Sequence, residues 1–191
     1  MVQLMTDERI RKIEEKIIAS KGIQLDIGCG RAKQPGWLGM DKRPIPEADV
    51  MHDMEDVPWP LPTSCAHTIL CSHVLEHIDP RNFLAVMAEM HRVAADGCQI
   101  LISTPYAGSF GGYQDPTHTR PGFNEATWTY FDPRPIRGNP NHLYSIYEPP
   151  PMFQERVHWD PNGNMEVVLK VHKNPVTLAK LLPKKVKKGK K

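Results

Sequence analysis

The segment from Gln24 to Arg31, Gln-Leu-Asp-Ile-Gly-Cys-Gly-Arg, constrains the fold more than any other part of this 191-residue chain. Its apolar residues form a short run that ends abruptly at a glycine, which is typical of a buried strand entering a tight turn. Gly28 and Gly30 have no Cβ, so they let the backbone bend and let a ligand come close. The pattern predicts a nucleoside-binding crevice at the carboxyl edge of a parallel sheet.

Two acids flank this turn. Asp26 lies at the end of the predicted strand, and Asp41 follows the apolar segment 37–40. A nicotinamide dinucleotide fingerprint would place a third glycine where Lys33 stands, and an acid about 20 residues further on. Because Lys33 replaces that glycine and Asp41 follows Gly30 by only 11 residues, the pattern favours a nucleoside without a pyrophosphate, and a nicotinamide oxidoreductase remains the less favoured alternative.

Further motifs follow in a fixed order. They are Leu-Asp-Ile-Gly-Cys-Gly at 25–30, Pro-Gly-Trp-Leu-Gly-Met-Asp at 35–41, Asp-Met at 53–54 with Trp-Pro-Leu-Pro at 59–62, and Ile-Leu-Cys-Ser-His-Val-Leu-Glu-His-Ile at 69–78. This ordered set resembles the class I S-adenosylmethionine-dependent methyltransferases, in the small type-11-like branch with a very short first crossover. The resemblance covers about residues 22–131. It implies an α/β fold with a doubly wound, mostly parallel seven-stranded sheet and a terminal antiparallel hairpin, a Rossmann-like architecture.

The resemblance also implies S-adenosyl-L-methionine as cofactor and S-adenosylhomocysteine as product. Asp41 would accept hydrogen bonds from both ribose hydroxyls, and Asp53 would accept one from the adenine amino group beside the Met54 N–H. Asp26 would hold either the loop or the cofactor's ammonium group. The residues expected to bind the cofactor are Asp26, Gly28, Cys29, Gly30, Asp41, Lys42, Asp53, Met54, Ser72 and His73.

Methyl transfer to a hydroxyl or a protonated amine also needs a base, and histidine titrates in the right range. His118, within segment 114–123, is the predicted base or acceptor-orienting group. His73 follows the predicted strand 67–72 and is expected to line the site. For both, a capping or buried hydrogen-bonded role is the alternative. Aromatic residues at 106, 113, 123 and 128 either wall an acceptor pocket or pack in a core.

No metal ligand is predicted. Segment 73–77 matches the zinc-protease pattern H-x-x-E-H, but it directly follows a predicted strand instead of lying within a helix. Some methyltransferases of other branches carry Glu-x-x-Glu-His after the fourth strand and use a divalent ion. This chain has histidine in place of their first glutamate, so an ion held by His73, Glu76, His77 and His118 is an alternative only.

The remaining pattern gives the expected elements. Helices are predicted at 6–20, 80–94 (capped by Asp79) and 124–130, a helical turn at 74–78, and strands at 23–27, 37–40, 48–52, 67–72, 99–103, 152–159 and 165–172. Segment 104–151 holds nine of the 19 prolines and has no clear period, so we expect an acceptor-site insertion or lid there. A single domain is predicted for 1–182, followed by a disordered tail at 183–191.

Charge and composition bear on the partner. The formal net charge is +2, and the tail alone carries six lysines, so the body is mildly acidic and poorly suited to a broad nucleic-acid groove. A small-molecule or saccharide-like acceptor for O- or N-methylation is therefore favoured. The alternatives are a nucleic acid or protein positioned by the lysine tail, and a degenerate module that binds cofactor or a partner without turnover.

The sequence also predicts no membrane partner, because no apolar run approaches the roughly 20 residues of a membrane span. No secretory leader is visible. The four cysteines form no C-x-x-C pair and fit reduced thiols in a cytoplasmic location.

Overall fold

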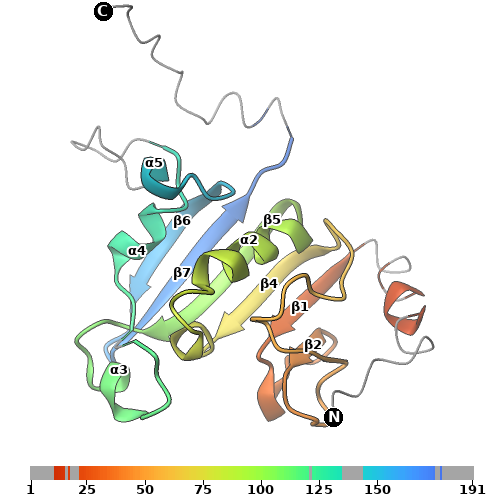
Figure 1. The fold of residues 1–191 in the computed structure, drawn as a ribbon, viewed down its shortest axis with the longest axis horizontal. Coiled ribbons are helices and arrows are strands. Elements are labelled where there is room, and N and C mark those ends of the chain that lie inside the picture. Colours follow the sequence, from red (N-terminus) through yellow and green to blue (C-terminus); the bar gives the residue numbers. More distant parts are fainter. Residues whose placement is uncertain are drawn as a thin grey trace, which may run out of the picture.

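The computed structural model describes residues 11–15, 17, 22–120, 122–134, 144–174 and 177. A seven-stranded sheet in the order β3-β2-β1-β4-β5-β7-β6 forms its centre (Figure 1). The strands are β1 (Ile23–Ile27), β2 (Leu38–Asp41), β3 (Val50–Met51), β4 (Ala66–Ser72), β5 (Ala94–Pro105), β6 (Met152–Trp159) and β7 (Asn164–Val171). β1 to β5 pair in parallel, and β7 pairs antiparallel with both β5 and β6. The predicted fold class, including the terminal antiparallel hairpin, is confirmed.

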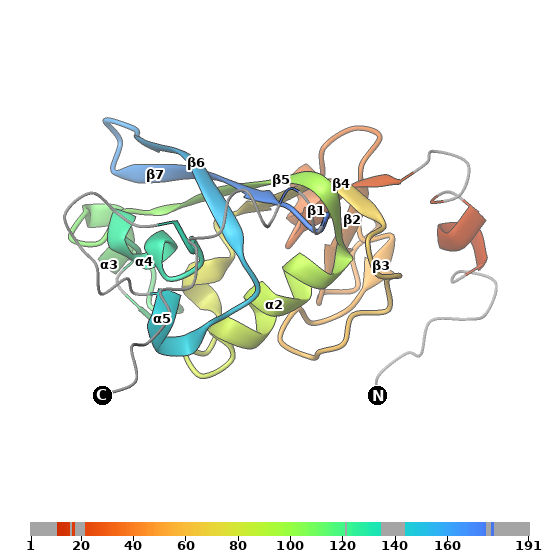
Figure 2. The same cartoon turned by 90° about the horizontal axis from the view of Figure 1, so that it is seen from above.

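The helical elements are short apart from one. They are η1 (Gly30–Ala32), η2 (Leu75–His77), α2 (Phe83–Val93), α3 (Phe110–Gln114), α4 (Glu125–Thr129) and α5 (Tyr144–Tyr147). Figure 2 shows α2, α4 and α5 on the same side of the sheet. In the described residues, the crossover from β1 to β2 contains only η1, in keeping with the predicted short first crossover.

The longest helix, α2, seals that face of the sheet. Its residues Val86, Met87, Met90 and Val93 are all fully buried, each at 0% exposure. They recur at the spacing of one helical face, so burying them against the sheet provides most of the driving force for docking the helix.

Most of the predicted strand and helix bounds lie within two residues of those observed, but the starts of α2 and β5 differ by more. The helix begins at Phe83 instead of residue 80, and its N-cap residue is Asn82, which makes no side-chain cap. Asp79 does not cap the helix; its carboxylate accepts hydrogen bonds from the backbone N–H of Arg81 at 2.8 Å and from Nη2 of Arg81 at 2.6 Å. β5 begins at Ala94 instead of residue 99, since Ala94 already pairs with Ala66 of β4.

Segment 104–151 holds the short helices α3, α4 and α5, and its aromatic residues build a second part of the core. Asn124 caps α4 through a capping box, accepting a hydrogen bond from the backbone N–H of Thr127. Trp128 and Phe131 are fully buried, and Phe123 lies 5.5 Å from Trp128, ring centre to ring centre. Phe123 and Phe131 also pack against Phe83, with ring centres 5.5 and 5.9 Å away, which anchors the segment to α2.

Some expectations fall on residues outside those described. Of the predicted helix at 6–20, residues 11–15 and 17 are described and are helical. The lysine-rich segment 183–191 lies outside, so the domain limits remain predictions. In the parts of the chain described here, no helix has the length and apolar character needed to cross a membrane.

The strand order reverses between β1 and β4. β1 pairs with β2 on one side and β4 on the other, with Ile27 opposite Met40 and Cys71. In open α/β sheets, ligands bind beyond the carboxyl ends of the strands at such a reversal.

Candidate functional site

A crevice of about 550 Å³ opens at this reversal. Its walls come from the ends of β1, β2 and β4, the loop after β3, η2 and the loop after α3. The lining residues are Ile27, Gly28, Met40, Asp41, Lys42, Arg43, His52, Asp53, Met54, Glu55, His73, Val74, His77, Ile78 and Thr117.

The glycine turn is held from the neighbouring strand. The backbone N–H groups of Gly28 and Cys29 both donate to Met40 O, at 2.7 and 3.2 Å. Gly28 has φ of +63°, and a Cβ added there would lie 2.4 Å from Cγ2 of Val74. Glycine is therefore required at this position by both the left-handed backbone and the close packing of Val74.

Asp41 joins the two sides of the crevice floor. Its Oδ2 accepts a hydrogen bond from the N–H of Gly30 at 2.9 Å, which holds the glycine turn against β2. Arg43 donates to both carboxylate oxygens, through Nε at 3.0 Å and Nη2 at 3.0 Å. Burial alone would raise the pKa of Asp41, but the hydrogen bonds from Arg43 and Gly30 hold it below the usual value.

Asp26 lies behind the crevice and not in its lining. It is buried at 4% exposure, and its Oδ2 accepts a hydrogen bond from the N–H of Gln34 at 2.9 Å. Burial raises the pKa of this carboxyl, although the Gln34 hydrogen bond opposes the shift. Of its two predicted roles, the structure places Asp26 where it holds the loop.

Lys33, which replaces the third glycine of a dinucleotide fingerprint, has a structural partner. Its Nζ lies 2.9 Å from Oδ2 of Asp49, and the same oxygen accepts a hydrogen bond from the N–H of Gly39. A Cβ on Gly39 would lie 2.5 Å from Cδ of Lys33. The aliphatic part of the lysine thus packs on Gly39 of β2, and its ammonium group pairs with Asp49.

Asp53 and Met54 form another wall of the crevice. Asp53 is partly exposed and lies 3.8 Å from Nζ of Lys42, a distant ion pair between residues that both line the crevice. Met54 is buried, and its backbone O accepts a hydrogen bond from Trp59 Nε1 at 2.9 Å.

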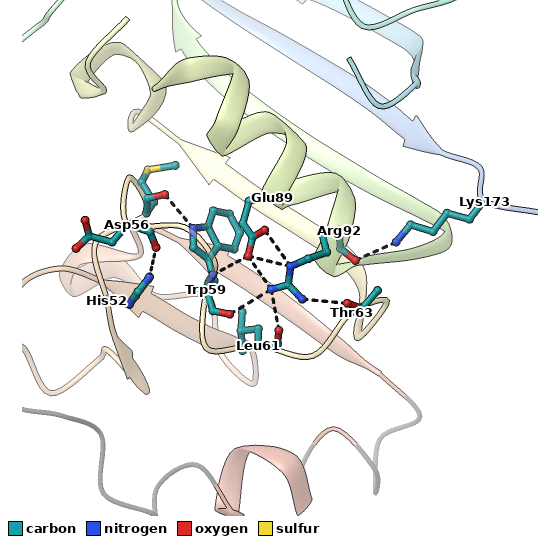
Figure 3. Close-up of polar contacts among 9 residues, drawn as sticks. His52, Asp56, Trp59, Leu61, Thr63, Glu89, Arg92 and Lys173 are labelled. Atoms are coloured by element: carbon teal, nitrogen blue, oxygen red, sulfur yellow. Dashed lines mark hydrogen bonds and ion pairs between the residues drawn. The ribbon is translucent and has the colours of Figure 1, made fainter. Parts of the chain in front are cut away.

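The loop that carries these two residues is tied to α2 by a buried polar network, shown in Figure 3. Glu89 accepts a hydrogen bond from the N–H of Trp59 at 2.6 Å and pairs with Arg92 at 2.6 Å. Arg92 also donates to the backbone oxygens of Trp59 and Leu61, at 3.1 and 2.8 Å. The sequence did not predict this network, because Trp59 lies 30 residues before Glu89 and each residue resembles an ordinary helix or loop residue.

His73 stands at the end of β4 in a left-handed conformation, with φ of +53°. Its ring lines the crevice, and Nδ1 donates to Oε1 of Glu76 at 3.2 Å. This hydrogen bond raises the pKa of His73, while partial burial opposes the shift. Ser72, one residue earlier, is exposed but does not line the crevice.

His118 lies behind the crevice wall instead of in it. Its ring contacts the ring of His77, with centres 4.8 Å apart, and its Nδ1 lies 3.1 Å from Gly112 O. His77 and Thr117 are the residues of this region that line the crevice. His118 is thus separated from the crevice by His77, which sequence reasoning had named only within the metal alternative.

The predicted cofactor residues therefore fall into two groups. Those that line the crevice are Gly28, Asp41, Lys42, Asp53, Met54 and His73, and those outside its lining are Asp26, Cys29, Gly30 and Ser72. Cys29 is buried, and burial together with nearby carboxylates raises the pKa of its thiol to about 11.

The aromatic residues considered for an acceptor pocket do not line this crevice. Phe123 and Trp128 are core residues, and Tyr106 packs edge-on against Trp159. Arg120, near His118 in sequence, places its guanidinium 4.7 Å from the ring centre of Phe83. The core-packing interpretation is therefore the better one for Phe123 and Trp128.

Comparison with solved structures agrees with this geometry. A SAM-dependent methyltransferase from Archaeoglobus fulgidus matches with a TM-score of 0.54 and 19% identity, covering 84% of this chain and 92% of the other. The chain has the fold of the class I methyltransferases.

Other structures with this fold differ in what they act on. The 1,6-didemethyltoxoflavin-N1-methyltransferase of Burkholderia thailandensis, solved with its substrate and S-adenosylhomocysteine, has a TM-score of 0.57 and 15% identity, covering 90% of this chain and 82% of the other. A 16S rRNA (adenine(1408)-N(1))-methyltransferase variant from Catenulisporales acidiphilia has a TM-score of 0.56 and 14% identity, covering 89% and 94%. No protein-family model matches the sequence, and comparison with curated proteins gave no significant match.

Proposed function

We propose that the protein is an S-adenosylmethionine-dependent methyltransferase. The observation that carries this proposal is the position of Asp41, which lines the crevice beside Gly28 at the reversal of strand order. Asp53 and Met54 stand on another wall of the same crevice. The methyltransferase fold, and the S-adenosylhomocysteine bound in two structures that share it, support the same assignment.

Each end of the cofactor has a suitable environment. The ribose hydroxyls would donate to Asp41, and the adenine would lie against Asp53 and Met54. The methionine part would lie between the glycine turn and His73. Charge-assisted hydrogen bonds to a carboxylate are stronger than neutral ones, so Asp41 is the main determinant of affinity that we assign.

Methyl transfer is an in-line displacement with a neutral leaving group, so no acid is needed to protonate it. The protein contributes mainly by holding the acceptor atom in line with the methyl group, an effect worth up to roughly 7–11 kcal/mol in favourable cases. We assign His73 and His77 to the surface that contacts the acceptor, and we place His118 behind them as a supporting residue.

For the acceptor, we propose a small molecule with a hydroxyl or amino group. The crevice is lined by residues of both charges, and the body of the chain is mildly acidic, which favours a compact polar ligand over a nucleic-acid groove. A structural neighbour that acts on rRNA makes nucleic acid the second candidate.

Calorimetric titration with S-adenosylmethionine, S-adenosylhomocysteine and NAD tests the cofactor. We expect the first two to bind and NAD not to bind, and absence of binding by both would contradict the proposal. Asp41→Asn should weaken binding of the first two by about 10- to 100-fold, the loss of a charge-assisted bond worth about 1.5–3 kcal/mol. Asp160→Asn, in the distant β6–β7 turn, is the matched control. Candidate acceptors are then screened for a mass gain of one methyl group.

A further inference from the structure

One group of side chains, in and behind the crevice wall that carries His77, has no role in the cofactor binding proposed above. A carboxylate oxygen of Glu76 and one ring nitrogen each of His77 and His118 lie within 4.8 Å of one another. Glu76 and His77 belong to η2, while His118 comes from the loop between α3 and α4. The fold thus brings together two imidazoles and a carboxylate, the donor types that borderline divalent cations prefer.

Hydrogen bonds set the tautomer of both rings. The carbonyl of Gly112 can only accept, so His118 Nδ1, 3.1 Å away, carries the proton. Oγ1 of Thr117 donates its own proton to Oδ1 of Asp115 at 2.7 Å. Thr117 must therefore accept from Nδ1 of His77, which lies 3.0 Å away.

In the neutral form of each ring, Nε2 is therefore the nitrogen without a proton, and its lone pair is available to a ligand. Metal-binding histidines are usually oriented in this way, with the second ring nitrogen donating to a carbonyl or a carboxylate-linked partner. Nδ1 of His77 donates to the hydroxyl of Thr117, which in turn donates to Asp115. Nδ1 of His118 donates to the main-chain carbonyl of Gly112.

Glu76 supplies the charge. Its side chain is fully buried, which is costly for a carboxylate unless it is paired or binds a cation. Oε1 accepts from His73 at 3.2 Å and Oε2 accepts from Thr104 at 3.4 Å, and each oxygen has a second lone pair free for a further partner.

We propose that Glu76, His77 and His118 form a binding site for one divalent first-row transition-metal ion. Ligand atoms around such an ion lie roughly 3.4 Å apart, so small side-chain rotations must draw these three together from their present separation. Three protein ligands leave positions open. Of the three residues only His77 lines the crevice, beside Thr117, so we place the open positions on that side.

The open positions suggest the class of acceptor, an inference that rests on the proposed methyltransferase function. A ligand with two adjacent oxygens, such as a vicinal diol or a catechol, would chelate the ion beside the methyl group. Binding to a divalent ion lowers the pKa of a bound hydroxyl, so the ion would favour the deprotonated, nucleophilic oxygen.

Cobalt(II) is a suitable probe, because its visible absorption reports its ligands. We expect the purified protein to bind one equivalent of Co²⁺, followed by absorption and by calorimetry. His77→Ala and His118→Ala should each weaken binding at least tenfold. Thr117→Val should weaken it about tenfold by releasing the orientation of His77. His67→Ala, an exposed histidine on β4, should leave it unchanged. Thermal melts establish that each variant is folded.

The outcomes separate this proposal from the preceding one. No Co²⁺ binding by a protein that binds S-adenosylmethionine, or equal loss of binding in His67→Ala and His118→Ala, overturns the metal site and leaves the cofactor assignment intact. Co²⁺ binding without cofactor binding supports the metal site and removes its catalytic role. Catechol should shift the Co²⁺ absorption bands and phenol should not; equal behaviour of the two would overturn the proposed acceptor class.

Discussion

Arg43 engages both oxygens of the Asp41 carboxylate, with Nε 3.0 Å from Oδ1 and Nη2 3.0 Å from Oδ2. Both residues line the crevice, and the carboxylate is the group that we assign to the cofactor ribose. A ribose that donates to Asp41 must therefore displace at least one of the hydrogen bonds from Arg43. The guanidinium is largely exposed, so the displaced side chain can move into water.

Arg43→Ala should therefore strengthen cofactor binding. An ion pair with one exposed partner is worth about 0–1 kcal/mol, so we expect an increase in affinity for S-adenosylmethionine of about two- to fivefold. Arg81→Ala is the matched control, because Arg81 pairs with Asp79 two residues earlier in the same way but away from the crevice lining. Calorimetry measures both. If Arg43→Ala binds S-adenosylmethionine more weakly than wild type while Arg81→Ala does not, the prediction is wrong and Arg43 contacts the cofactor directly.

Asp41 should also make stability depend on pH. Its pKa is below the usual value in the folded protein, so the carboxylate stabilises the fold above the unfolded-state pKa of about 3.9. This contribution is lost as the pH falls through the lower, folded-state pKa. The difference in unfolding free energy between wild type and Asp41→Asn should be constant from pH 5 to 7 and shrink below about pH 4. Urea denaturation across this range measures it, and a difference that grows on acidification would contradict the assignment.

Gly28→Ala should destabilise the protein through two separable effects. The left-handed φ costs roughly 1–2 kcal/mol with a Cβ present, and overlap with Val74 adds about 1–3 kcal/mol. Gly36→Ala is the matched control, since Gly36 has φ of +83° and a Cβ there would meet no atom within 4 Å. It should show the backbone cost alone.

Adding Val74→Ala to Gly28→Ala should recover part of the loss, because the clashing atoms are Cγ1 and Cγ2 of Val74. Chemical denaturation of the two single variants and the double variant gives the coupling free energy. Additive effects would show that the overlap is relieved by movement of the backbone.

Glu89→Gln should affect both stability and cofactor binding. The substitution keeps the shape but removes the charge that accepts from Trp59 N–H and pairs with Arg92. We expect a loss of about 1.5–3 kcal/mol in unfolding free energy, and weaker cofactor binding because the attached loop carries Asp53 and Met54. Glu155→Gln is the control, since Glu155 pairs with Lys170 at the surface at 3.4 Å. If Glu89→Gln is destabilised but keeps its cofactor affinity, the hydrogen bonds of Glu89 stabilise the fold without positioning Asp53 and Met54 for the cofactor.

The sequence predicted the elements best where the determining interactions are local. The hairpin strand Met152–Trp159 has the predicted bounds, because its alternation and the turn after it are read from adjacent residues. The start of α2 was missed, since Asp79 uses its carboxylate in a local turn with the backbone N–H and guanidinium of Arg81, and the helix begins only at Phe83. The start of β5 was missed because pairing with β4, and not local propensity, extends the strand to Ala94.

For the site, the sequence by itself determined the strand, the glycine turn and the acid at the end of the next strand, since each is specified by a few consecutive residues. Tertiary structure alone decided that Lys33 packs beside Gly39, that Glu89 holds the loop of Asp53, and that His118 lies against His77. These contacts join segments from different parts of the sheet and its insertion. The first depends on how the connection between β1 and β2 packs on β2, the second on how α2 lies beside the loop after β3, and the third on how segment 104–151 packs against η2. Local periodicity specifies none of these packing arrangements.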